Sequence, residues 1–287
     1  MTPTESHVLA AIDASEYSAA VCDMAALAAR RLNCGVEVLH IVQRPDSVAR
    51  RRDLSGAVGL GAKSGLMAEL AEIDAAEAKL ARQRGDLILS GAEERLRSAG
   101  IDDVTVTHRH GDIVETIVER ERQATLVVLG QRGASAGFAP GHLGSKVERV
   151  VRASDRPVLV AARDYREVRR IVIAYDGGAT SDKAAALAAT NPLAAGCAIL
   201  MVMAGREDDG TRRAKLEDAA ARFTDHDVDI RLTDGPAEEV IADAARDFGA
   251  DLLLMGAYGH SPLRRLIVGS TTTTMLQTLD IPVLLFR

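Results

Sequence analysis

Spaced glycines followed by a Gly-Ser pair occur twice in this chain, each time directly after an apolar run. The residues are Gly130, Gly133, Gly144 and Ser145 in the first set and Gly256, Gly259, Gly269 and Ser270 in the second. Glycine permits close approach of the backbone, so that main-chain N–H groups can face an anion. A helix that begins there adds free N–H groups and the positive end of its dipole. The pattern predicts a phosphate-binding turn in each half.

Hydroxyl groups and one positive charge accompany these turns. Ser145 and Ser270 suit the N-cap position of a helix, or can direct their hydroxyls to a ligand oxygen. Lys146 follows the first serine and Thr271 the second, so each could add a further contact to a phosphate. A cap and a tight turn without a ligand would use the same residues, but the duplication favours binding.

Each half also places an aspartate after its first apolar run, Asp13 in one and Asp176 in the other. At the end of a strand, such a carboxylate can accept hydrogen bonds from an adenine amino group or a sugar hydroxyl, or hold a metal through water. It can equally cap the next helix. The residues alone leave both interpretations open, although the second copy favours a binding site.

These residues belong to a repeat of the whole chain. Residues 7–13 correspond to 170–176, and 156–160 correspond to 281–285. The third glycine of each motif stands 13 residues before a proline in both copies. Matching elements in a fixed order indicate a duplicated domain. We expect domains over residues 1–164 and 165–287.

Each copy alternates short apolar runs with segments of helical spacing, such as 19–32 and 238–248. The expected strands are near 6–12, 34–42, 103–108, 125–130 and 157–162, and then near 169–175, 197–203, 227–232, 251–256 and 282–286. Alternating strands and helices predict an α/β fold of two tandem doubly wound domains, each a parallel sheet flanked by helices. The ligand crevice of such a sheet lies at the carboxyl ends of the strands, where both aspartates and both glycine motifs fall.

The first copy is longer than the second. Asp13 and Gly130 are 117 residues apart, whereas Asp176 and Gly256 are 80 apart, so the first copy carries 37 extra residues at about 44–86. Residues 56–64 within this insertion imitate a P-loop, but the lysine comes one residue late and no apolar strand precedes it. We interpret the insertion as a mobile segment that could cover the first site.

Composition argues against several classes of function. The net charge is −6, aromatic residues are 3% of the chain and Trp is absent, so a nucleic-acid-binding surface is not expected. Three scattered cysteines suggest a reducing compartment. No apolar run is long enough to span a membrane, and the first residues lack a signal core. We therefore expect a cytoplasmic protein without membrane or nucleic-acid partners.

A metal site is conceivable at His108 and His110, which flank Arg109. No third ligand follows at a suitable spacing, so a solvated strand end is the favoured interpretation.

Both halves resemble the universal stress protein domain, over roughly 6–162 and 169–286, and together they look like a tandem member of that family. The second glycine motif matches the pattern of the ATP-binding branch, while the first has ten residues instead of nine before its Gly-Ser pair. The resemblance implies a five-stranded parallel sheet of HUP-like fold in each half. It also implies ATP or another adenine nucleotide at the crevice, with or without Mg²⁺, and pairing of the two halves through their last strands as an intramolecular pseudo-dimer.

The resemblance further implies which residues form each site. In the second half, Asp176 and Val202 would border adenine and ribose, and the phosphates would lie against Gly256, Gly259, Gly269, Ser270 and Thr271. The counterparts in the first half are Asp13, Ile41, Gly130, Gly133, Gly144, Ser145 and Lys146. Whether one or both halves are occupied is left open.

The expected function is that of a nucleotide-binding sensor or regulator in the stress response, acting on protein partners that the sequence does not name. A slow ATPase is one alternative, but neither motif offers a base or a water-positioning group beside the γ-phosphate, so hydrolysis should be weak at most. A scaffold that binds no nucleotide is the other. Further association of two chains into a homodimer stays open.

Overall fold

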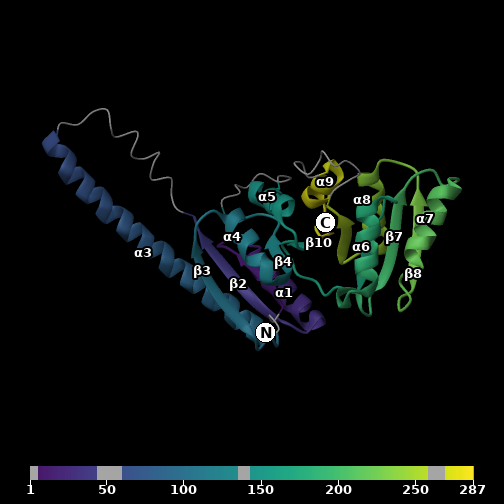
Figure 1. The fold of residues 1–287 in the computed structure, drawn as a ribbon, viewed down its shortest axis with the longest axis horizontal. Helices are drawn as coiled ribbons and strands as arrows, with labels where there is room; N and C mark the ends of the chain where they lie inside the picture. Colours follow the sequence, from purple (N-terminus) through teal and green to yellow (C-terminus); the bar gives the residue numbers. More distant parts are fainter. Residues whose placement is uncertain (1–5, 44–59, 135–142, 258–268, 287) are drawn as a thin grey trace.

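The computed structural model contains one continuous ten-stranded sheet with helices on both faces (Figure 1). It describes residues 6–43, 60–134, 143–257 and 269–286. The strands are β1 (His7–Ile12), β2 (Gly35–Val42), β3 (Val104–His110), β4 (Ala124–Gly130), β5 (Val158–Ala161), β6 (Arg170–Ala174), β7 (Ala198–Ala204), β8 (Val228–Thr233), β9 (Leu252–Gly256) and β10 (Val283–Phe286). Each overlaps a predicted strand, so all ten predictions are confirmed.

The strand order is β3-β2-β1-β4-β5-β10-β9-β6-β7-β8. Five strands of each half are therefore arranged in the same order, and their neighbours pair in parallel. The halves meet where β5 and β10 pair antiparallel, with Leu159 opposite Leu284. This is the pairing through the last strands that the family resemblance implies. The α/β fold class is confirmed, and the domain boundary in the connection between β5 and β6 stays a prediction.

Two layers of helices enclose the sheet. The helices are α1 (Ser18–Leu32), α3 (Leu60–Ser98), α4 (Ile113–Arg120), α5 (Ser145–Ala153), α6 (Ala179–Thr190), α7 (Gly210–Ala220), α8 (Ala237–Phe248) and α9 (Ser270–Thr278), with short 3-10 turns at Glu121–Gln123 and Pro192–Ala194. Successive residues of a strand point to opposite faces, so Val8 and Ala10 join a core beneath α1, α3, α6 and α7, while Leu9 joins the core beneath α4, α5, α8 and α9.

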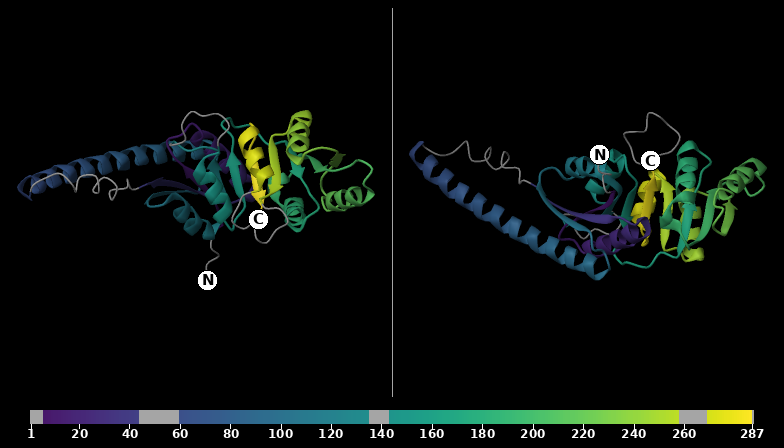
Figure 2. Two further views of the ribbon diagram at one scale, coloured as in Figure 1. Left: turned by 90° about the horizontal axis from the view of Figure 1, so that it is seen from above. Right: turned by 60° about the horizontal axis from the view of Figure 1, so that its bottom comes forward.

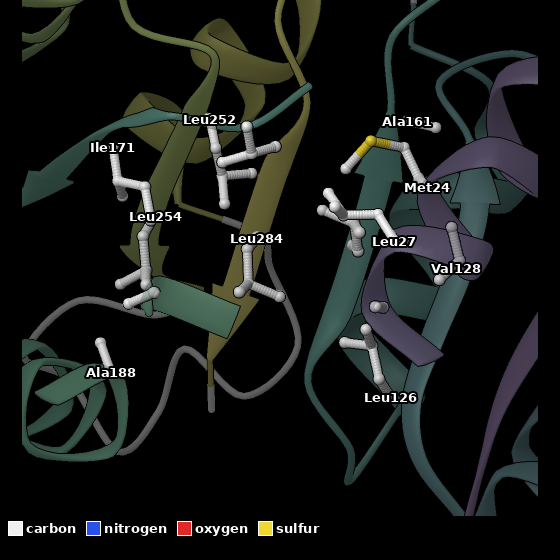
Figure 3. Close-up of a cluster of buried hydrophobic side chains, with 14 of the residues drawn as sticks. Met24, Leu27, Leu126, Val128, Ala161, Ile171, Ala188, Leu252, Leu254 and Leu284 are labelled. Atoms are coloured by element: carbon white, nitrogen blue, oxygen red, sulfur yellow. The ribbon is translucent and has the colours of Figure 1, made fainter. Parts of the chain in front are cut away.

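Each of these cores contains residues of both halves, which makes the two halves one packed unit. Figure 3 shows this at the junction, where Met24 and Leu27 of α1 lie on one side and Leu252 and Leu284 on the other. Polar contacts reinforce the junction on both faces of the sheet. Arg31 donates to the carbonyl of Val168 at 2.7 Å and to that of Leu193, and the Gln131 amide donates to the carbonyl of Leu276.

The insertion at about 44–86 was expected to be a mobile segment that could cover the first site, and its described part differs from this expectation. Residues 44–59 lie outside the described part, but the rest of the insertion forms α3, which would be about 58 Å long at 1.5 Å per residue. The helix leads away from the sheet and does not cover the first site (Figures 1 and 2). The physical reason is composition: residues 66–98 are rich in Ala, Leu, Glu and Arg and contain no Pro, so the ordinary crossover helix simply continues outward.

The base of α3 packs on the sheet through a glycine. A Cβ atom at Gly85 would lie 2.5 Å from the His108 ring and 2.9 Å from the His40 ring. The expected solvated strand end is therefore wrong for His108, whose Nδ1 lies 3.1 Å from Asp86 and whose side chain is 17% exposed. His110 is exposed. The absence of a side chain at position 85 lets the helix approach the two imidazoles closely.

Two glycines of α3 should respond oppositely to alanine. Gly85→Ala should lower the free energy of unfolding by roughly 1–3 kcal/mol, because the new methyl group overlaps the imidazole rings. Gly91→Ala is the matched control: no atom lies within 4 Å of a Cβ there, and alanine should stabilise by about 0.5–1 kcal/mol through its better helix propensity. Urea unfolding followed by circular dichroism measures both, and similar effects of the two changes would contradict the tight contact.

Candidate functional site

A cavity of about 320 Å³ lies at the carboxyl ends of β1, β2 and β4 in the first half. In the strand order β1 and β4 are neighbours, and the chain winds away from them in opposite directions, so this is the point where the strand order reverses. The cavity is lined by all seven residues predicted for the first site: Asp13, Ile41, Gly130, Gly133, Gly144, Ser145 and Lys146. Residues separated by up to 133 positions in the sequence are thus brought together.

The cavity combines apolar walls with a small set of polar groups. The apolar residues include Leu39 and Ile41 of β2, Ile113 and Ile117 of α4, and Val147 and Val150 of α5. The polar side chains are Asp13, Ser15, Ser18, Arg132, Ser145 and Lys146. One carboxylate and two cations give the lining a net positive charge. Apolar walls with few polar groups are typical of small-molecule sites, and a positive balance suits an anionic ligand.

Asp13 ties the glycine motif to the end of β1. Its Oδ1 accepts a hydrogen bond from the Ser15 N–H at 2.9 Å, and its Oδ2 accepts one from the Ala134 N–H at 2.7 Å. A Cβ atom at Gly133 would lie 2.8 Å from this Oδ2, which explains the second glycine of the motif. The N-cap of α1 is Tyr17, so the alternative in which Asp13 caps the helix is wrong.

The first glycine of each motif permits a close approach between a strand and the helix that follows β1 or β6. A Cβ atom at Gly130 would lie 2.6 Å from Cβ of Tyr17, at the start of α1. A Cβ atom at Gly256 would lie 3.0 Å from Cγ2 of Thr180, at the start of α6. Both positions therefore favour glycine for steric reasons that hold with or without a ligand.

The N-terminus of α5 is open toward the cavity. Gly144 occupies the N-cap position and forms no side-chain cap, so of the two roles given to Ser145 the helix cap is wrong, and contact with a ligand oxygen stays a prediction. Glycine provides no capping group, and within the described part of the chain the N–H groups of Ser145 and Lys146 have no acceptor. The Lys146 ammonium donates to Gln43 Oε1 at 2.6 Å. Free N–H groups, a hydroxyl and an ammonium group thus meet at one end of the cavity.

The second half repeats part of this arrangement. Asp176 Oδ1 accepts from the Gly178 N–H at 2.9 Å and from the Ser181 hydroxyl at 2.5 Å, while Gly178 itself is the N-cap of α6. At the start of α9, Gly269 is the N-cap and lacks a side-chain cap, so Ser270 is not the cap there either. Thr271 follows in the first turn of α9. Gly259 lies outside the described residues.

The register of the strands changes one correspondence between the halves. Ala174, two residues before Asp176, pairs with Val202. Ala11, two residues before Asp13, pairs with Leu39. Leu39 is therefore the structural counterpart of Val202, and Ile41 lies two residues further along β2. Both Leu39 and Ile41 line the cavity. Leu39 is therefore added to the residues predicted for the first site, and Ile41 remains one of them.

Several cavity residues were not predicted from the sequence. Ile113 and Ile117 come from α4, and Arg132 lies between the first two glycines of the motif. Ser18 donates to the main-chain carbonyl of Asp13 at 2.5 Å, and its counterpart Ser181 contacts Asp176. A serine five residues after the motif aspartate in both halves was the signal that could have found this pair.

A buried ion pair lies beside the cavity. Glu37, 2% exposed, accepts two hydrogen bonds from the Arg120 guanidinium, at 2.9 and 2.8 Å, and the His7 ring lies 3.1 Å away. Burial raises the pKa of Glu37, but the hydrogen bonds from His7 and Arg120 outweigh it and hold the pKa at about 2, against an ordinary value of 4.5. The carboxylate is therefore charged throughout the neutral range.

This ion pair fixes one wall of the cavity. Alternate residues of a strand share a face, so Glu37 lies on the same face of β2 as Leu39, which lines the cavity. Arg120 ends α4, the helix that contributes Ile113 and Ile117. The pair therefore anchors α4 against β2 immediately below the cavity.

Within the described ranges, no group of three or more His, Cys, Asp or Glu side chains is placed to hold a metal ion. The same residues include no helix with the length and apolarity needed to cross a membrane.

Comparisons with known proteins agree on one family. The family model described as the universal stress protein family matches residues 5–162 and 200–287. A universal stress protein of Synechocystis sp. is 33% identical over 290 residues, covering 98% of this chain and 99% of its own. A solved universal stress protein from Archaeoglobus fulgidus has a TM-score of 0.68 at 20% identity, covers 98% of this chain and 96% of its own, and supports the fold.

Another solved structure, which matches a smaller part of the chain, is a universal stress protein in complex with cAMP. It covers 42% of this chain and 97% of its own at 21% identity, and its TM-score of 0.36 is too low for its ligand to bear on the present cavity. The family itself rests on the two matched segments and on the relative that aligns from end to end. The chain belongs to the universal stress protein family.

Proposed function

We propose that the cavity of the first half binds ATP or another adenine nucleotide, and that the protein acts as a cytoplasmic regulator whose surface depends on this ligand. The observation that carries the proposal is the convergence of all seven predicted residues on one cavity. Its volume is within the usual range for small-molecule sites, roughly 300–1,000 Å³.

Each part of a nucleotide has suitable partners in the lining. Leu39, Ile41 and Ile117 offer an apolar wall to a purine ring. Asp13 can accept hydrogen bonds from an amino group or from ribose hydroxyls. The open N-terminus of α5 and the ammonium group of Lys146 suit phosphate oxygens, since both supply N–H donors and positive charge.

Ligand binding would be coupled to the glycine motif through Asp13. Its Oδ2 accepts the Ala134 N–H, so a ligand hydroxyl or amino group that donates to this oxygen competes with the loop contact. Occupancy would then change the conformation of the motif loop at the protein surface. This is a route from nucleotide binding to recognition by protein partners, and it requires no hydrolysis. Hydrolysis that is weak at most stays a prediction.

Removing the ammonium group of Lys146 tests the phosphate contacts. Lys146→Ala should raise the dissociation constant for ATP roughly ten- to a hundredfold, because a charge-assisted hydrogen bond contributes about 1.5–3 kcal/mol. The effect on adenosine should be small, since adenosine lacks phosphates. Isothermal titration calorimetry with both ligands measures this difference.

Lys183→Ala provides the control, because Lys183 is an exposed lysine of α6 on the other face of the sheet. It should leave both affinities unchanged. Absence of ATP binding to the unmodified protein would refute the proposed function, and equal losses for the two lysine variants would remove the role of Lys146.

A further inference from the structure

The helix α3 has an exposed apolar stripe. Ile73, Leu80 and Leu87 are spaced seven residues apart and are 52%, 47% and 75% exposed. They are three of the five large hydrophobic side chains that are exposed in the described part of the chain. Seven residues are nearly two turns of an α-helix, so the three side chains form one stripe that drifts by only about 20° per step.

This stripe faces away from the sheet. The buried residues at the base of α3 are Gly85, Leu89, Ala92 and Leu96, which follow one face of the helix. Leu87 is two residues after Gly85, a rotation of about 200°, so it lies on the opposite face. Figure 2 shows α3 extending well beyond the sheet. A second helix could therefore lie along the stripe without meeting the sheet.

Where its side chains are described, the projecting part of α3 lacks the tertiary packing that normally supports a helix. Every described side chain from 71 to 80 is exposed. Most helical stability in proteins comes from packing of an apolar face. Ile73 and Leu80 are apolar side chains that would stabilise the helix if a partner buried them.

Over residues 69–84 of α3 the charges are separated by sign, and the acidic Asp86 follows them. Acidic residues come first: Glu69, Glu72, Asp74 and Glu77. Basic residues follow: Lys79, Arg82 and Arg84. An identical helix laid alongside in the same direction would place acidic against acidic and basic against basic. The reverse direction places each acidic segment against a basic one.

We propose that α3 pairs antiparallel with α3 of a second copy of this chain, so that the protein is a dimer. A two-fold axis midway between Ile73 and Leu80 sets each Ile73 level with Leu80 of the other copy. The same axis sets Glu69 level with Arg84, and both lie within about 40° of Ile73 around the helix. One face is thus complementary to itself in both apolar contact and charge, which is the requirement of a two-fold interface. A foreign partner would not need this internal symmetry.

Sedimentation equilibrium of the full chain tests the proposal. The unmodified protein should have twice the 30.5 kDa of one chain. Ile73→Glu combined with Leu80→Glu should raise the dissociation constant at least about 100-fold, because the two changes bury charges in the apolar stripe of each helix. Leu187→Glu on α6 is the matched control, since Leu187 is a 41% exposed leucine remote from α3, and it should leave the dimer intact.

Charge reversal distinguishes the antiparallel arrangement. Glu69→Lys with Glu72→Lys and Asp74→Lys gives both segments a net positive charge, although Glu77 remains, and the dimer should dissociate. Adding Lys79→Glu, Arg82→Glu and Arg84→Glu to the same chain again gives the two segments opposite charges, and the protein should dimerise again. All of these side chains are exposed, so the fold should survive, which circular dichroism checks.

Two results would overturn the proposal. One is a monomer at all concentrations up to about 100 µM, where even an interface of micromolar affinity would be filled. The other is a dimer that persists in both the Ile73/Leu80 variant and the first charge-reversal variant, because association would then use another surface.

Discussion

Replacing Arg120 with alanine should destabilise the protein by about 3 kcal/mol, the largest loss of stability that we expect from a change of one side chain at the cavity wall. The guanidinium group makes two hydrogen bonds to Glu37, whose carboxylate is 2% exposed. Removing one partner of a buried ion pair leaves the other charge without compensation, at a typical cost of about 3–5 kcal/mol. Arg120 is 26% exposed, so water can partly replace it, and we expect the lower end of that range.

The second half of the chain suggests a compensating change. Val172 pairs with Leu200 as Leu9 pairs with Glu37, so Leu200 occupies the position of Glu37. Counted from the N-cap of each helix, Ala244 of α8 occupies the position of Arg120 in α4. The second half therefore has an apolar contact where the first has an ion pair.

The double variant Glu37→Leu/Arg120→Ala should recover most of the stability that Arg120→Ala loses. Burying an apolar pair can be as favourable as burying an ion pair, because neither charge has to leave water. Urea unfolding of the two single variants and the double variant gives the coupling between the residues. If Arg120→Ala lowers the free energy of unfolding by less than about 0.5 kcal/mol, the Glu37–Arg120 pair contributes no more to stability than a surface ion pair does.

The same pair gives the fold a defined sensitivity to acid. The pKa of Glu37 is about 2 in the folded protein, below its ordinary value of 4.5. A lowered pKa contributes stability that is complete above pH 4.5 and is lost as the pH falls toward 2. Between these values the unmodified protein should lose more stability than the Glu37→Leu/Arg120→Ala variant. Parallel losses in the two proteins would assign the acid sensitivity to other carboxylates.

The strands and the convergence of the site were predictable because both depend on local sequence and on parallel topology. Apolar runs are easily read as buried strands, and residues at the carboxyl ends of parallel strands must meet at one edge. For this reason Asp13, Gly130 and Ile41 were expected near one another before their contacts were known, and all three line the cavity.

Other features depend on contacts that no periodicity encodes. Ile113 and Ile117 line the cavity because Arg120 anchors α4 to Glu37, a contact between residues 83 positions apart. The correspondence of Leu39 with Val202 required the strand register, which a short apolar run leaves uncertain by two residues. The close approach of α3 to β2 and β3 uses the contact of Gly85 with two imidazole rings.

Filling the cavity with a tryptophan should abolish nucleotide binding in the first half. Ala11 lines the cavity at the end of β1, and the larger side chain would occupy the space proposed for the nucleoside. To bind, the ligand would have to displace a buried aromatic group, which costs about 3 kcal/mol and corresponds to at least about a 100-fold rise in the dissociation constant. Calorimetric titration with ATP measures the change, and thermal unfolding checks that the variant is folded.

The chain contains its own matched position for this experiment. Ala174 stands two residues before Asp176 and pairs with Val202, as Ala11 stands before Asp13 and pairs with Leu39. If only the first half binds ATP, Ala174→Trp leaves the titration unchanged; if both halves bind, each tryptophan removes one of two sites and the double variant removes both. An Ala11→Trp protein that keeps the full stoichiometry and affinity would show that the nucleotide does not use this cavity. The two variants therefore test separately whether ATP binds in this cavity and which half of the chain binds it.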